Sequence, residues 1–316
     1  MKKQFVNELK VGDKVNDYFV IEKISQIPYV KNPSDGKFLA IELRDKTGTI
    51  DAKKWTKGTE TTALHDSLKG VQIIKISGDV DEFRNTPSIT LDKNPEIVSD
   101  YEFPEDFILT TKKDIQQMIE ELKNEISKIS NNHIKQLLES FSEDDEFMKR
   151  FSRAAAAKKM HHNYVGGLLE HVLNLIAISK TVQARHPELD SDLLVAACIL
   201  HDIGKVEELD MGVKIDFSDD GRFYSHISIG FRMVSKMIEK ISDFPKELER
   251  KILHIILSHH GKQEYGSPVK PMFLEAIAFH HIDNSDATIQ KVKQIIQDDN
   301  DEEWVWGPDR DLYYTK

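Results

Sequence analysis

The apolar and polar residues of the first hundred positions alternate with the two-residue period of β-strands. In the clearest case Leu39, Ile41 and Leu43 fall on one face and the residues between them on the other. Turn residues at 45–48 separate this segment from the next and predict a hairpin. The predicted strands are Tyr18–Ile24, Phe38–Arg44, Thr49–Trp55, Val71–Val80 and Ser88–Leu91, and a short helix is predicted at Thr59–Lys69.

Three strands, a helix and two further strands follow one another in the order of an OB-fold, a small barrel that often binds single-stranded nucleic acid. We therefore predict an all-β N-terminal domain over residues 1–100. Its outward face would carry aromatic and basic residues suited to base stacking and phosphate contact. The candidate nucleic-acid-binding residues are Phe38, Arg44, Lys53, Trp55 and Arg84. The alternative, that Phe38 and Trp55 only close the barrel, stays open at this point.

Beyond residue 111 the apolar positions recur with the spacing of helices. Residues 101–110 are predicted to be a linker, and the isoleucines and leucines of Lys112–Ser140 predict helices that bridge two domains. The predicted divisions after the first domain are 101–150 for the linker and bridging helices, 151–300 for an all-α domain and 301–316 for an acidic and aromatic tail.

The helical pattern of the second half is expected to be interrupted once. Met211–Tyr224 lacks helical spacing and contains the turn-forming residues Asp219, Asp220 and Gly221. These three residues are expected to form a turn between two short extended pieces. A helix is expected to resume at Ser225.

Composition adds constraints on size and compartment. The chain has 316 residues, of which 39% are hydrophobic, and this length suits two domains with cores of their own. No run of 18 apolar residues occurs, so no transmembrane helix and no membrane partner are expected. The first residues lack the apolar core of a signal peptide, which favours a cytoplasmic location. The single cysteine, Cys198, excludes an internal disulfide and fits a reducing compartment.

The formal net charge of −11 argues against indiscriminate binding to nucleic acid. The charge is unevenly distributed, because residues 1–100 hold 16 basic and 16 acidic side chains. The residues after Gln297 hold seven acids against Arg310 and Lys316. A polyanion would therefore be tolerated best by the first hundred residues, or beside metal ions that offset the acid elsewhere.

Histidines and aspartates mark the helical half as the place for chemistry. The apolar run VAACIL at 195–200 leads directly into His201 and Asp202, a polar pair at the end of a buried helix. One histidine on a helix face is usually a core residue. Here His171, His226 and the pair His259-His260 also lie on or beside otherwise apolar helices. Imidazole nitrogens and carboxylate oxygens without cysteine are the ligands expected for first-row divalent metals.

The local contexts of these residues resemble a known family. GGLLEH at 166–171, HDIGK at 201–205 and Asp283 after EAIAFHHI resemble the H…HD…D signature of the HD-domain metal-dependent phosphohydrolases. Together with SHISIG at 225–230, SHHG at 258–261 and the strand-rich first half, the whole chain resembles the YhaM-type 3′→5′ exoribonucleases. Members of that family pair an N-terminal OB-fold with a C-terminal HD domain.

The resemblance implies a metal-dependent hydrolase that removes nucleoside 5′-monophosphates from the 3′ end of single-stranded RNA. Single-stranded DNA as a further substrate and a homo-oligomeric state are left open. The resemblance implies two divalent ions, such as Mn²⁺ or Co²⁺, with Asp202 between them and Lys205 near the scissile phosphate as the catalytic pair. The implied metal ligands are His171, His201, Asp202 and Asp283, joined in members with two ions by His226 and by His259 or His260. Which residue of the pair His259-His260 is a ligand stays open on the sequence.

Two other functions stay open on the sequence. HD domains also hydrolyse nucleotides and cyclic dinucleotides, although a strand-binding barrel has little use in such an enzyme. A non-catalytic nucleic-acid-binding protein with a relict HD domain is the second alternative. The presence of all four core ligands, His171, His201, Asp202 and Asp283, disfavours it.

Overall fold

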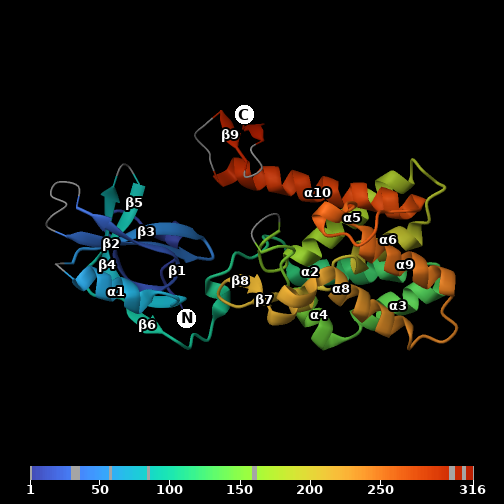
Figure 1. Cartoon of the computed structure of the whole chain (residues 1–316), viewed down its shortest axis with the longest axis horizontal. Helices are drawn as coiled ribbons and strands as arrows, with labels where there is room; N and C mark the ends of the chain where they lie inside the picture. Colours follow the sequence, from blue (N-terminus) through green and yellow to red (C-terminus); the bar gives the residue numbers. More distant parts are fainter. Residues whose placement is uncertain are drawn as a thin grey trace. The chain divides into compact units, whose positions relative to one another are not determined.

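The computed structural model divides the chain into two compact units, which are described separately (Figure 1). The first comprises Met1–Thr110 with Gly212–Lys214, and the second Thr111–Met211 with Ile215–Lys316. No helix among the described residues is long and apolar enough to cross a membrane. The residues that the structure describes are 2–29, 36–56, 59–83, 86–158, 162–298, 303–307 and 311–315.

In the part of the first unit that the structure describes, five strands form a closed barrel. β1 pairs with both β2 and β4, β2 with β3, and β5 lies between β3 and β4, so the strand order β1-β2-β3-β5-β4 returns to β1. Among the described strands of this unit, only the β3–β5 pair is parallel. This order, with a helix between β3 and β4, is that of an OB-fold and confirms the predicted class. The elements are β1 (Lys14–Pro28), β2 (Lys37–Asp45), β3 (Gly48–Lys54), α1 (Glu60–Leu68), β4 (Ile73–Phe83), β5 (Thr86–Leu91) and an added strand β6 (Glu96–Val98).

The inward-facing apolar side chains of β2 and β3, which alternate with outward-facing ones, fill the barrel. Leu39, Ile41 and Leu43 are buried in its core, as their spacing predicts. β1 is much longer than the predicted strand Tyr18–Ile24, because it serves two neighbours. Its first half pairs with β4 and its second half with β2, and the register shifts between Ile21 and Lys23. A bulge of this kind bends a strand and lets one segment close a barrel.

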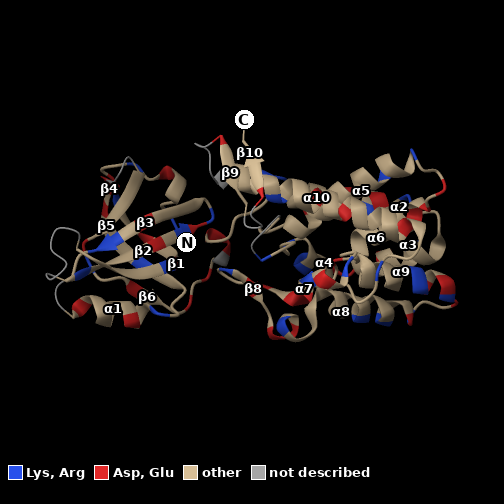
Figure 2. Cartoon of the chain, turned by 45° about the horizontal axis from the view of Figure 1, so that its top comes forward, with Lys and Arg blue, Asp and Glu red and all other residues tan. Residues whose placement is uncertain are grey.

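The second unit is helical around α6, as the fold class predicts. Every residue from Leu193 to Leu200 is buried, since α6 is apolar on all sides and packs against α3, α5, α9 and α10. The elements are α2 (Ile115–Ser127), α3 (Asn132–Ser142), α4 (Asp145–Phe151), α5 (Gly167–Gln183), α6 (Ser191–Leu200), α7 (Lys205–Glu208), β7 (Leu209–Met211), β8 (Ile215–Phe217), α8 (Asp219–Ile238), α9 (Lys246–Ser258), α10 (Leu274–Asp298), β9 (Trp304–Trp306) and β10 (Leu312–Tyr314). Figure 2 shows acidic and basic residues interspersed over both units.

The helices expected to bridge two domains are part of the helical unit. α2 and α3 are separate helices, because Asn131 caps α3 by accepting from the backbone N–H groups of His133 and Ile134. Met118, Leu122 and Ile126 of α2 join the core of the helical unit. Within the predicted tail, Trp304–Trp306 and Leu312–Tyr314 pair as the antiparallel strands β9 and β10, and Val305 is buried.

The prediction of a turn at Asp219, Asp220 and Gly221 is wrong. Those residues form the first turn of α8, which Ser218 caps by accepting a 2.9 Å hydrogen bond from the N–H of Gly221. Acidic side chains favour a helix N-terminus because they complement its dipole. The turn of this segment lies instead at Gly212–Lys214, between the paired strands β7 and β8.

Candidate metal centre

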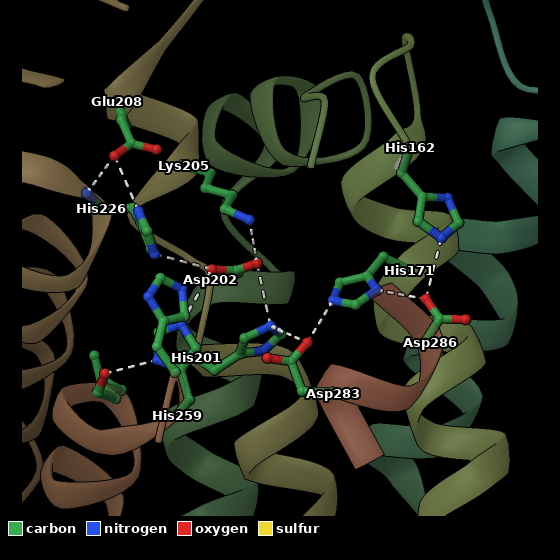
Figure 3. Close-up of polar contacts among 12 residues, drawn as sticks. His162, His171, His201, Asp202, Lys205, Glu208, His226, His259, Asp283 and Asp286 are labelled. Carbon is green, nitrogen blue, oxygen red and sulfur yellow. Dashed lines mark hydrogen bonds and ion pairs between the residues drawn. The ribbon is translucent and has the colours of Figure 1, made fainter. Parts of the chain in front are cut away.

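The centre lies where the buried helix α6 ends. His201 and Asp202 directly follow Leu200 and are only 0% and 3% exposed. An imidazole and a carboxylate withdrawn this far from water destabilise the fold unless they bind partners of their own. The partners come from α5, α8 and α10 and from the residues that follow α9 (Figure 3).

A first cluster joins α5, α6 and α10. His171, His201 and Asp283 place one ligand atom each within 4.8 Å of the others. Nε2 of His171 lies 3.2 Å from Oδ1 of Asp283, and Nε2 of His201 lies 3.8 Å from the same oxygen. Oδ2 of Asp202 adds a further oxygen, 3.2 Å from Nε2 of His201.

A second cluster joins α8 to the end of α9. His226, His259 and His260 again bring three ligand atoms within 4.8 Å of one another. Oδ1 of Asp202 lies 3.5 Å from Nε2 of His226 and 3.6 Å from Nε2 of His259. Asp202 therefore turns one carboxylate oxygen toward each cluster (Figure 3).

All five histidines of the two clusters are oriented in the same way. In each ring Nδ1 faces an oxygen that accepts a hydrogen bond, so in the neutral form of the ring Nδ1 carries the proton and Nε2 offers the lone pair that a metal needs. The acceptors are Asp286 for His171 at 2.7 Å, the carbonyl of Cys198 for His201 at 3.1 Å, Glu208 for His226 at 2.9 Å, the carbonyl of Ile256 for His259 at 2.8 Å and the carbonyl of Tyr265 for His260 at 2.8 Å.

The residues present fit divalent cations. Among the described residues, Nε2 of His201, His226 and His259 and Oδ1 of Asp202 are buried without a hydrogen-bond partner. Each such atom costs about 1–3 kcal/mol of folding free energy when nothing binds it. All four point into the two clusters, and a nitrogen and oxygen ligand set without sulfur suits first-row divalent ions.

The charge states suit cation binding at most of these residues. Burial raises the pKa of Asp202, but Lys205 and His201 outweigh it and hold that pKa well below its usual range. Burial, and then the neighbouring imidazoles, lower the pKa of His259 and of His260, which favours the neutral form that binds metals. His171 differs, because hydrogen bonds to Asp283 and Asp286 outweigh its burial and raise its pKa to about 9.

Two backbone features bring His226 to Asp202. A Cβ on Gly204 would lie 2.1 Å from the carbonyl oxygen of His226 and 2.6 Å from the amide nitrogen of Gly230, so only glycine permits this approach of α7 to α8. Ser225 interrupts α8 with φ 57° immediately before His226. Such a conformation is costly for a residue other than glycine and is found mostly at functional sites.

Lys205, predicted as the phosphate contact, lies at the same centre. Its Nζ is 2.5 Å from Oδ2 of Asp202. A cavity of about 330 Å³ opens over both clusters, and its walls include Lys205, Tyr265, His280 and Asn284. The structure thus brings together all seven predicted metal ligands and Lys205.

Sequence reasoning did not assign Asp286 or Glu208. Asp286 follows Asp283 by three residues, and one helical turn on α10 therefore separates them. This spacing is the one signal that could have pointed to Asp286. Glu208 ends α7 and accepts from His226 across 18 positions of sequence, which no local pattern indicates.

The predicted nucleic-acid-binding residues of the first unit have different surroundings. Trp55 is 52% exposed and stacks on Tyr29, with ring centres 5.6 Å apart and planes 12° apart. Phe38 lies beneath them, 4.9 Å from Trp55. Its expected outward exposure is wrong, since Tyr29 and Trp55 cover it and leave 9% exposed. Lys53 is partly exposed on β3.

The guanidinium of Arg44 already has partners within the first unit. It forms a 2.9 Å ion pair with Glu22 and donates to the carbonyl of Phe107. Its expected outward face is therefore occupied by protein contacts. Arg84, the fifth predicted residue, lies outside the described residues.

Comparison with known proteins gives consistent matches. The family model described as "HD domain" matches residues 168–288. A protein named 3′-5′ exoribonuclease YhaM from Bacillus velezensis is 34% identical over 281 residues, which cover 88% of this chain and 86% of that protein. The proteins of the same name from Bacillus subtilis and Bacillus licheniformis are each 33% identical, over 91% of this chain and 89% of theirs.

Proposed function

This chain belongs to the YhaM family of 3′-5′ exoribonucleases, and we propose that it hydrolyses single-stranded RNA from the 3′ end to nucleoside 5′-monophosphates. The observation that carries the proposal is the position of Asp202 between two histidine clusters, with one oxygen toward each. That arrangement suits two divalent ions, one beside His171, His201 and Asp283 and one beside His226, His259 and His260.

The chemistry of phosphodiester hydrolysis agrees with this donor set. Divalent ions, when bound, lower the pKa of water toward 7 and offset the charge of the phosphate. Mn²⁺, Co²⁺ or another first-row ion matches imidazole and carboxylate ligands. Neither a serine nor a cysteine nucleophile is needed, and burial raises the pKa of the Cys198 thiol to about 12, which makes it a poor nucleophile.

Within the cavity the chain itself supplies the phosphate contact and the fit to a strand end. The Lys205 ammonium would move from Asp202 to a non-bridging phosphate oxygen and stabilise the charge that develops there. A cavity of about 330 Å³ lies at the small end of ligand sites and suits one terminal nucleotide.

The aromatic group of Tyr29, Phe38 and Trp55 is the proposed binding surface for bases further along the strand. Exposed aromatic rings bind successive bases by stacking, with little dependence on sequence or sugar. We therefore include single-stranded DNA as a second substrate. Lys53, on the neighbouring strand β3, would contact the backbone phosphates.

Product analysis tests the direction and the substrate. A single-stranded RNA labelled at its 5′ end, incubated with the protein and Mn²⁺, should shorten stepwise and release nucleoside 5′-monophosphates, separated by gel and by chromatography. Internal cuts, or hydrolysis confined to mononucleotides and cyclic dinucleotides, would contradict the proposal.

The variant His201→Ala with Asp202→Ala tests the site. It should lose bound metal and RNA cleavage, since both clusters lose ligands, while binding to single-stranded RNA is retained. The matched control is His186→Ala with Glu188→Ala, an exposed histidine and acid 3.4 Å apart, which should leave metal content and cleavage unchanged. Cleavage that survives in the first variant would refute the site assignment.

A further inference from the structure

Two buried carboxylates lie behind metal-ligand histidines and outside the two clusters described above. Asp286 lies on α10, and Glu208 ends α7. Each is buried, and each accepts from Nδ1, the ring nitrogen that points away from the cluster. Figure 3 shows Glu208 behind His226 and Asp286 behind His171, on opposite sides of the centre.

Asp286 is held from several directions. Its Oδ2 accepts from Nδ1 of His171 at 2.7 Å and from Nε2 of His162 at 3.1 Å, and Asn174 donates to its Oδ1 at 3.4 Å. Nδ1 of His162 in turn lies 2.8 Å from the hydroxyl of Tyr164. The carboxylate therefore has one position, and His171 takes its ring orientation from it.

Glu208 holds both the ring and the backbone of His226. Its Oε1 accepts from Nδ1 at 2.9 Å and from the backbone N–H of the same residue at 2.7 Å. This double contact stabilises the irregular backbone at Ser225, where α8 is interrupted. The orientation of His226 thus depends on one oxygen.

The other three histidines of the clusters donate to backbone carbonyls instead. A carboxylate acceptor makes an imidazole a stronger ligand than a carbonyl does, because its charge raises the basicity of the ring. Each cluster contains one histidine of this kind, His171 in the first and His226 in the second.

We propose that Asp286 and Glu208 are positioning residues that set the affinity of one ion each. Asp286 acts through His171 on the ion of the first cluster, and Glu208 acts through His226 on the ion of the second. The inference rests on the proposed two-ion function, and it adds that the two affinities are set separately by residues that touch neither ion nor substrate.

Binding of Mn²⁺ to the full chain, measured by isothermal titration calorimetry, tests the assignment. Asp286→Asn and Glu208→Gln keep shape and remove charge. Each should lower the affinity for one Mn²⁺ ion by about 10- to 100-fold and leave the affinity for the other ion unchanged. The matched control is Glu125→Gln, a buried carboxylate ion-paired with Lys128 and Lys180 away from the centre, which should change neither affinity.

Single-cluster backgrounds identify which ion is affected. In a chain that carries His226→Ala, only the first cluster is complete, so Asp286→Asn should weaken the remaining ion and Glu208→Gln should not. In a chain that carries His171→Ala, only the second cluster is complete, so Glu208→Gln should weaken binding of the remaining ion and Asp286→Asn should not. Equal weakening of both ions by either variant, or no weakening by both, would overturn the inference.

Folding is checked on the metal-free chains by thermal unfolding, and affinity is fitted to the folded fraction. If Asp286→Asn does not fold, His162→Gln replaces it and should weaken the same ion by a smaller factor; an unchanged affinity would overturn the inference. Wild-type binding of a single ion would refute the two-ion proposal and one of the two assignments, and the single-cluster chain that still binds the ion would decide the other. If the two variants weaken metal binding selectively but the wild-type chain does not shorten RNA, the exonuclease proposal is refuted and the inference about Asp286 and Glu208 stands.

Discussion

The protonation of His171 links the first cluster to pH. In the metal-free chain the carboxylates of Asp283 and Asp286 outweigh burial and raise the pKa of this imidazole to about 9. At neutral pH its Nε2 therefore carries a proton, 3.2 Å from Oδ1 of Asp283. A metal ion that binds here has to displace that proton, because only the neutral imidazole is a ligand.

Metal affinity at the first cluster is accordingly predicted to rise with pH up to about 9. Displacement of one proton makes the affinity increase about tenfold per pH unit below that pKa and level off above it. Calorimetric titration of the His226→Ala chain with Mn²⁺ between pH 7 and 9 measures this slope on the first cluster alone. A constant affinity over this range would contradict the prediction, because it would show that His171 is already neutral at pH 7.

The second cluster provides the internal control. Burial and neighbouring imidazoles lower the pKa of His259 and of His260, so both are neutral over the same range. The His171→Ala chain should therefore show little change of affinity between pH 7 and 9. A slope as steep as that of the first cluster would contradict the assignment of the proton to His171.

For individual residues, the sequence predicts the metal ligands but not the two carboxylates that orient them. His171, His201, Asp202 and Asp283 stand in motifs whose neighbours identify them. Glu208 and Asp286 are two among 54 acidic residues, and their role depends on where helices cross. Their hydrogen bonds span 18 and 115 positions, beyond the reach of any local pattern.

Between elements, the approach of α7 to α8 depends on Gly204. We predict that Gly204→Ala destabilises the chain by about 1–3 kcal/mol, because the added Cβ would collide with the backbone of α8. The resulting displacement of α8 should weaken binding of the ion beside His226 more than binding of the ion beside His171. Thermal unfolding and calorimetry with Mn²⁺ measure the two effects.

Gly212→Ala is the matched control for that substitution. It lies in the turn between β7 and β8, where the nearest atom to an added Cβ is 3.8 Å away, an ordinary contact. Its stability and metal affinity should stay within about 0.5 kcal/mol of wild type. If Gly204→Ala behaved in the same way, the close approach would not be what positions His226.

Periodicity predicted element types better than element ends. β2 was predicted nearly in full because Leu39, Ile41 and Leu43 all face the barrel core. β1 is about twice as long as its predicted strand because pairing with β4 and β2 extends it at both ends, and its end beyond Ile24 has no buried side chain to mark it. At the start of α8 the sequence predicts a turn because Asp and Gly favour both a turn and, behind Ser218, a helix N-terminus.

Across the whole chain, charge and exposed aromatic residues suggest a division of work between the units. The first hundred residues are neutral overall, and the acidic excess lies in the remainder. A polyanion meets less repulsion on the first unit, whereas the acidic second unit holds the ligands proposed to bind cations. This division of charge could be predicted from sequence, but the stacking partner of Trp55 could not, because Tyr29 was assigned no role.

We therefore predict that Trp55→Ala weakens binding of a long single-stranded RNA by about 5- to 100-fold, the loss expected for one stacked base. Hydrolysis of a dinucleotide should be unchanged, since that substrate fills only the cavity of the helical unit. Trp304→Ala is the matched control, because Trp304 is 51% exposed and also packs against a tyrosine ring, that of Tyr314 at 5.0 Å. Equal losses on long and short substrates, or a loss confined to Trp304→Ala, would place strand binding elsewhere than on the aromatic group of the first unit.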